Sequence, residues 1–135
     1  MFFFNSKWLL ISQKDVVDCP KVTAPKKAAE VIVKSENKLP VYIGLRGIKT
    51  YCTKDNDNVE MEISVNVRAI RKENNIEDYV PVKITLVSTD MNNQEYGRDS
   101  FKYSQFLLKG SKIVDRETDF DIKIPNGGQV YLGLR

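Results

Sequence analysis

The amino-acid sequence predicts an all-β fold: an immunoglobulin-like antiparallel β-sandwich of six to seven strands with one short helix. Three observations indicate this class. Apolar and polar residues alternate with period two over long stretches, turn-forming clusters recur about every 10–15 residues, and helical periodicity is almost absent. A small barrel is the alternative architecture. The 135 residues suffice for one domain, and we expect a leader at 1–15 and a β-sandwich domain at 16–135.

The opening segment, MFFFNSKWLLIS, is similar to a degenerate or clipped secretory signal. Asn5, Ser6 and Lys7 interrupt its apolar run, which is also too short to span a bilayer. A native first strand packed on the domain and an interfacial membrane anchor are the other interpretations.

Residues 25–33, PKKAAEVIV, carry the one helical signal. Pro25 suits the first position of a helix, and two alanines follow it. The β-branched residues from Val31 to Val33 then favour an extended chain. We therefore expect about two helical turns before the first long strand.

The first long strand is expected at 38–52, with alternate residues from Val41 to Leu45 inward and a bend or bulge near Gly47. The KDNDN sequence at 54–58 has the acids and amides of a calcium loop. It lacks the required glycine and glutamate at the later positions, so it predicts an Asx-rich turn and no metal site.

The clearest strand signal is VEMEISVNVRA at 59–69, where six apolar residues alternate with polar ones. A second alternating run follows at 79–88, after a polar connection at 71–78. Pro81 removes a backbone donor from this run, so it should lie at a sheet edge, at a bulge or near the strand start.

Three further strands complete the expected sandwich. Tyr96 to Tyr103 predict one strand, with Gly97 as a bulge, and 116–125 predict the next. Asn-Gly-Gly at 126–128 marks a hairpin or loop, and 129–135 form the last strand.

The two cysteines, Cys19 and Cys52, lie near predicted strand ends and are candidates for one disulfide. In an oxidising compartment the bond would stabilise the fold by roughly 3–4 kcal/mol. In a reducing compartment both would be buried thiols, and the sequence leaves this choice open. Asp18 and Val17 do not fit the small residues that precede a lipid-modified cysteine, so we expect no lipid on Cys19.

Composition excludes several classes of function. The sequence contains no histidine, which removes the usual general base, the common nucleophile pairs and the commonest transition-metal ligand. A net charge of +3 with interspersed acids and lysines does not indicate nucleic-acid binding. We expect a protein that is not an enzyme, with no catalytic residues, no metal and no cofactor. A hydrolase with a pair of carboxylates would require two acids that converge in a cleft.

Three stretches together resemble a known family: CPKVTAPKKAAEVI, YCTKDNDNVEMEISVNVRAIR and GGQVYLGLR. They are similar to uncharacterised envelope lipoproteins of alpha-proteobacteria, rickettsia-like in composition, over about residues 18–135. The resemblance implies a lipidated cysteine upstream of the Cys-Pro motif, and Cys19 and Cys52 facing each other in an oxidising periplasm. The chain departs from the family pattern in its degenerate leader and in ending before the family's further C-terminal segment.

The function expected is therefore that of a non-enzymatic β-sandwich of the bacterial cell envelope, periplasmic or associated with the outer membrane. It would bind a protein partner, self-associate or support the envelope. Membrane association would come only through a leader or an upstream lipid. The alternative is a small-ligand carrier that binds in the mouth of the sandwich or barrel.

Overall fold

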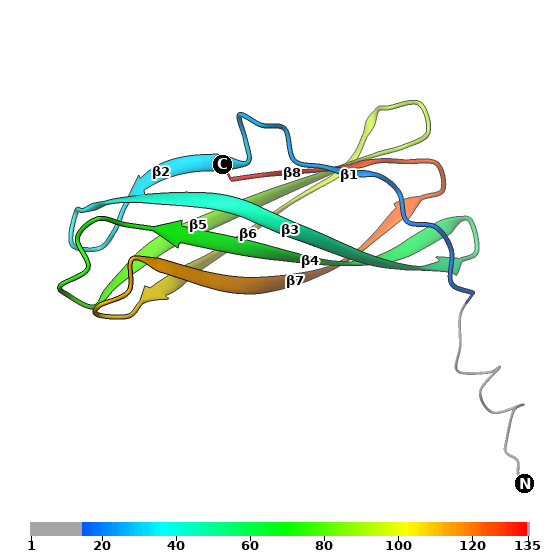
Figure 1. The fold of residues 1–135 in the computed structure, drawn as a ribbon. Coiled ribbons are helices and arrows are strands. Elements are labelled where there is room, and N and C mark those ends of the chain that lie inside the picture. The colour runs from blue at the N-terminus through cyan, green and yellow to red at the C-terminus, as the bar shows by residue number, and fades with distance from the viewer. Residues whose placement is uncertain (1–14, 135) are drawn as a thin grey trace, which may run out of the picture.

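The computed structural model describes residues 15–134, so all but the last residue of the predicted leader lies outside the described residues. Two four-stranded sheets pack face to face (Figure 1). In the described part of the chain the strands are Val22–Thr23 (β1), Glu30–Lys34 (β2), Pro40–Asp55 (β3), Asn58–Ile70 (β4), Asp78–Thr89 (β5), Glu95–Leu107 (β6), Ile113–Pro125 (β7) and Val130–Gly133 (β8). The prediction of an all-β sandwich is confirmed at this level.

The sheets have the strand orders β2-β3-β4-β7 and β1-β8-β5-β6. All neighbours pair antiparallel except β1 and β8, which are parallel. Residues 15–134 contain eight strands instead of the expected six to seven. The additional strands are short, and strands of two to five residues are too short for an alternating pattern to indicate them.

The hairpin of β3 and β4 follows the sequence prediction closely. Asn56, with a φ of 57°, turns the chain between Asp55 and Asn58, because asparagine tolerates the left-handed region. The register shifts between Leu45 and Ile48, which confirms the bulge expected near Gly47. Two long twisted strands therefore run the length of the molecule side by side (Figure 1).

Within residues 15–134, β2–β3 and β5–β6 are also hairpins within one sheet, and the other connections cross between the sheets. Residues 71–77 lead from β4 to β5 in the other sheet, and 108–112 lead back from β6 to β7. The Asn-Gly-Gly segment at 126–128 is a crossing loop and not a hairpin, because β7 and β8 belong to different sheets. As a result β7 lies beside β4, with the β5–β6 hairpin in the facing layer.

The short helix expected at 25–33 is not formed. The chain makes one turn, in which the N–H groups of Ala28 and Ala29 donate to the carbonyl of Pro25, and then enters β2 at Glu30. The β-branched residues of β2 gain a backbone partner in β3 and bury one face, which outweighs the weak helical preference of a single Pro-Lys-Lys-Ala-Ala turn.

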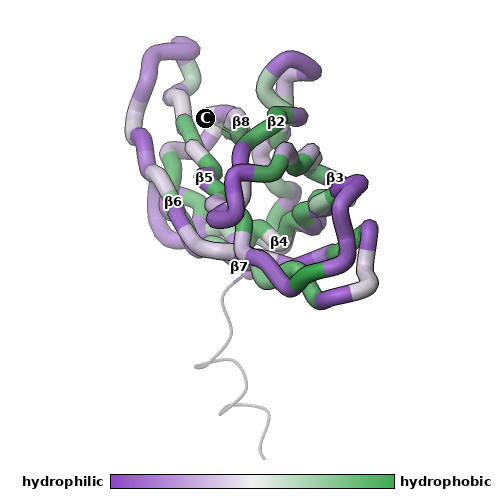
Figure 2. The backbone as a smooth tube through the Cα atoms, turned by 90° about the vertical axis from the view of Figure 1, so that its left-hand side faces the viewer, coloured by the Kyte–Doolittle hydropathy of each residue, from purple (hydrophilic) through white to green (hydrophobic). Residues whose placement is uncertain are grey.

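The core lies between the two sheets and uses alternate residues of each long strand. In β4 the inward residues are the six apolar residues predicted from the sequence, and all are buried: Val59, Met61, Ile63, Val65, Val67 and Ala69. Phe101 of β6 and Phe120 of β7 stack across the layers with ring centroids 4.2 Å apart. Hydrophobic and hydrophilic positions alternate along the strands in the end-on view of Figure 2.

Candidate functional site

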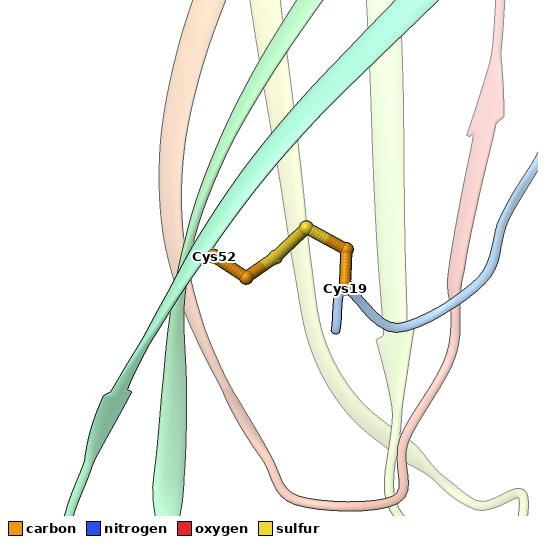
Figure 3. The surroundings of a disulfide bond; sticks show 2 residues. All are labelled: Cys19 and Cys52. Carbon is orange, nitrogen blue, oxygen red and sulfur yellow. A yellow bond between two sulfur atoms is a disulfide. The ribbon is translucent and has the colours of Figure 1, made fainter. Parts of the chain in front are cut away.

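Cys19 and Cys52 form a disulfide, as the sequence made possible (Figure 3). Cys52 lies on the inner face of β3 and is 1% exposed, while Cys19 belongs to the segment that precedes β1. The two Cα atoms are 5.2 Å apart, within the ordinary range for a disulfide. The alternative of two free buried thiols is therefore excluded.

The disulfide fixes the N-terminal segment along β3. Val17 donates its N–H to the carbonyl of Cys52 at 3.1 Å, and Lys54 donates to the carbonyl of Asp15 at 2.8 Å. Val16 forms an isolated antiparallel bridge with Thr53. The bond is thus structural: it holds an extended segment against the strand that carries Cys52.

Away from the disulfide, one long side of the sandwich is open between the two sheets. β8 pairs with β5 only from Thr85 to Ser88, although β5 begins at Asp78. The first half of β5 therefore has β6 on one side and no strand of residues 15–134 on the other. In the facing sheet β2 is the terminal strand on the same side.

Pro81 lies in this half of β5. Val130 and Leu134 donate their N–H groups away from β5. By alternation the backbone groups of Tyr131 and Gly133 face β5, and those of their partners Val87 and Thr85 face β8. By strand alternation Pro81 faces the same edge, where it offers no N–H group. Its position near the strand start and beside the open edge confirms the sequence prediction.

An apolar cavity of about 710 Å³ occupies the open side. Its walls come from β2 and β3 in one sheet, from β5 and β6 in the other, and from the end of the chain after β8. The apolar lining residues are Val31, Val33, Ile43, Pro81, Val82, Tyr103 and Leu134. The volume is within the range of cavities that hold small ligands or peptide side chains.

Asp78 closes one end of the open side. Its carboxylate is 3% exposed and accepts the N–H of Tyr79 at 2.8 Å, while Glu36 donates its N–H to the carbonyl of Tyr79. Burial alone would raise the pKa of Asp78, but hydrogen bonds from Ser35, Tyr79 and Asn37 bring it below its ordinary value. The turn between β2 and β3 is thereby held against the start of β5.

The other long side of the sandwich, between β6 and β7, is bridged by side chains. Gln105 is 1% exposed and donates to the carbonyl of Val114 at 3.0 Å. Arg116 lies over the ring of Tyr103, 4.1 Å from its centroid, and the hydroxyl of Thr118 donates to that of Tyr103. The two long sides therefore differ: one is bridged by polar contacts and the other has an apolar opening.

A pair of acids does face one hollow on the outer surface of the sheet. Glu62 and Asp121 are directly opposite on β4 and β7 and line a polar hollow of about 590 Å³. Both side chains are exposed. Across residues 15–134, no group of three or more His, Cys, Asp or Glu side chains is arranged to hold a metal ion.

Comparison with protein-family models, curated proteins and solved structures finds no match to this chain. Within the described range, no helix has the length and apolar character needed to cross a membrane. The fold and site define a disulfide-containing β-sandwich with one open side.

The sequence analysis does not predict the open side of the sandwich, although the sequence contains two signals for it. Pro81 marks a strand edge, and the apolar centre of EVIVK at 30–34 marks a strand whose edge carries no central charge. Neither signal shows that β8 pairs with only four residues of β5, because the length of a strand pairing depends on residues far apart in the sequence.

Proposed function

We propose that this chain is a non-enzymatic binding or structural module of the bacterial cell envelope, which acts by protein–protein contact on the open side of its sandwich. The observation that carries the proposal is the apolar cavity between β2 and the half of β5 that β8 leaves uncovered. A protein partner with an extended segment would place alternate apolar side chains in the cavity and hydrogen-bond to a strand edge.

Location in the envelope is supported by the disulfide of Cys19 and Cys52, because such bonds persist in oxidising compartments such as the periplasm. The resemblance to alpha-proteobacterial envelope lipoproteins points to the same compartment. Attachment to a membrane through a leader or an upstream lipid belongs to this proposal and stays a prediction.

An immunoglobulin-like type of sandwich is also proposed. Its support is the crossing pattern, in which β4 and β7 are neighbours in one sheet while the β5–β6 hairpin lies in the other. Greek-key crossings of this kind are typical of immunoglobulin-like domains. Loops at the ends of such sandwiches, and their strand edges, commonly carry binding sites instead of catalytic ones.

The second candidate function is a carrier of a small apolar ligand. The volume and apolar lining of the cavity favour it directly. The uncovered edge of β5 favours the protein partner, because a small apolar ligand cannot form hydrogen bonds with the backbone N–H and C=O groups along a strand.

The two candidates are separated by binding to two probes. A displayed library of random twelve-residue peptides tests for strand addition, and a fluorescent long-chain fatty acid tests for a carrier. Val31→Arg places a long charged side chain at the cavity wall, and Ile113→Arg, at an exposed position of β7, is the matched control.

We expect peptides with alternating apolar residues that bind the wild type and the Ile113→Arg variant but not the Val31→Arg variant. Saturable binding of the fatty acid at one site per chain, without such peptides, would select the carrier. If neither probe binds in a way that depends on Val31, the proposed function is wrong.

A further inference from the structure

The two sheets have four terminal strands, and three of them carry features that discourage pairing with another chain. β1 has only two residues. β6 has a bulge near Gly97 and charged residues along its length, and β7 alternates charges from Asp115 to Lys123. Short strands, bulges and charges are the usual protections of a sheet edge.

β2 lacks these protections. Its sequence is EVIVK, with Val31, Ile32 and Val33 in the centre and charges only at the two ends. Ile32 is 71% exposed, so a large β-branched side chain stands in solvent at the middle of a terminal strand. A regular edge strand of five residues with an apolar centre is suited to pairing with a further strand.

The backbone of β2 presents a regular set of groups to that edge. Leu45 donates to the carbonyl of Ala29, and Ser35 donates to the carbonyl of Leu39, so Ala29 and Ser35 face β3. By alternation Glu30, Ile32 and Lys34 direct their N–H and C=O groups away from β3. No strand of the described chain pairs on that side.

The charges of β2 are complementary to those of a second β2 that runs antiparallel to it. When the pair is centred on Ile32, Glu30 of each copy lies opposite Lys34 of the other, and the two Ile32 residues face each other. Opposite charges placed directly across an antiparallel pair stabilise it, and a shift of two residues in register would separate them. The hydroxyl of Tyr42 donates to Glu30 on the same outer face, and the carboxylate keeps a second oxygen for Lys34 of the other copy.

We propose that two copies of this chain associate through antiparallel pairing of their β2 strands about a two-fold axis at Ile32, which joins the two sheets into one of eight strands. The inference rests on the proposed function and names the partner on the open side. Each of the three facing pairs exchanges two N–H···O bonds. Val31 and Val33 of each copy, which line the cavity, gain apolar neighbours across the pair.

Charge reversal tests the pairing in the full 135-residue chain. Glu30→Lys and Lys34→Glu each place like charges opposite one another at both ends of the pair, so each should raise the dimer dissociation constant by roughly tenfold. A mixture of the two variants restores opposite charges and should form a mixed dimer. The double variant E30K/K34E should dimerise like the wild type. Sedimentation equilibrium measures all four cases.

A cysteine at the two-fold axis tests the register. Facing residues of such a pair have Cα atoms about 5.5 Å apart, which a disulfide can bridge. Ile32→Cys should therefore cross-link two copies under mild oxidation, whereas Lys34→Cys, which is also exposed but remote from its own counterpart, should not. The products are separated on non-reducing gels and identified by mass.

A wild-type chain that stays monomeric, single reversals that leave the dissociation constant unchanged, or equal cross-linking of both cysteine variants would overturn the inference. These outcomes leave the proposed function standing if peptides are still recovered that bind the wild type but not the Val31→Arg variant. Dimerisation without such peptides would instead support the pairing of β2 and refute binding of other proteins at the cavity.

Discussion

Asp78 holds the turn between β2 and β3 against the start of β5, at one end of the open side. It is buried at the start of β5, and its carboxylate accepts hydrogen bonds from Tyr79 and from the turn that joins β2 to β3. Since these hydrogen bonds lower the pKa of Asp78 in the folded chain, the folded state favours the ionised form more than the unfolded state does. Its contribution to stability is therefore complete above the ordinary carboxyl pKa and is lost as the pH falls through the folded-state pKa.

We expect Asp78→Asn to lower the free energy of unfolding at pH 7 by roughly 1–3 kcal/mol, because a charged acceptor of buried N–H groups is replaced by a neutral one. The difference from the wild type should shrink below about pH 4, where the unfolded chain takes up the proton. Urea unfolding between pH 2 and 7 measures both effects.

Asp115→Asn is the matched control for this variant. Asp115 pairs with Arg68 at 2.9 Å, but both side chains are 38% exposed, so solvent screens the pair. Its loss should cost no more than about 1 kcal/mol. A cost for Asp115→Asn equal to that for Asp78→Asn would contradict the role assigned to Asp78.

At the scale of elements, the sequence predicts long strands and misses short ones for a physical reason. β4 alternates over its whole length because one face meets the core and the other meets water, and this pattern can be recognised without a structure. The sequence predicts a helix over part of β2, because its five residues follow a Pro-Lys-Lys-Ala-Ala turn, and only tertiary pairing with β3 makes them extended. The same tertiary origin explains why the cavity beside β2 could not be predicted.

The connection from β7 to β8 gives a test at this scale. A Cβ atom at Gly128 would lie 2.0 Å from the carbonyl oxygen of Thr89, at the end of β5. Because that neighbour is backbone, we expect Gly128→Ala to force the connection away from β5 and to destabilise the fold by at least about 2 kcal/mol.

Gly47, in the bulge of β3, has no heavy atom within 4 Å of a Cβ position, and Gly47→Ala serves as the control. It should change stability by less than about 0.5 kcal/mol. Thermal unfolding of the two variants compares them directly, and similar melting temperatures would show that the Gly128 contact is not limiting.

At the scale of the whole molecule, one covalent bond joins the segment before β1 to the end of β3 that leads into the β3–β4 turn. The sequence offered the pair Cys19 and Cys52 as a disulfide or as two thiols, and the structure joins them across a separation of 33 residues. The choice depended on whether two segments meet in space, which composition and spacing do not determine.

Removal of this bond by Cys19→Ser together with Cys52→Ser should lower the free energy of unfolding by about 3–4 kcal/mol, through the greater entropy of the unfolded chain. Urea unfolding measures the change. Reduction of the wild type should increase its intact mass by about two mass units. Wild-type stability that is insensitive to reductant would contradict a structural role for the bond.

The disulfide also has a consequence for orientation. It holds Asp15 beside Lys54, at the tip of the β3–β4 hairpin, whereas the cavity meets β3 at Ile43, eleven residues back along the same strand. At about 3.3 Å per residue, roughly 35 Å separate the two places. A tether joined ahead of Asp15 would thus leave the domain at one pole, and β3 would act as a rigid spacer that presents the cavity at the other pole, directed away from the surface to which the tether is fixed.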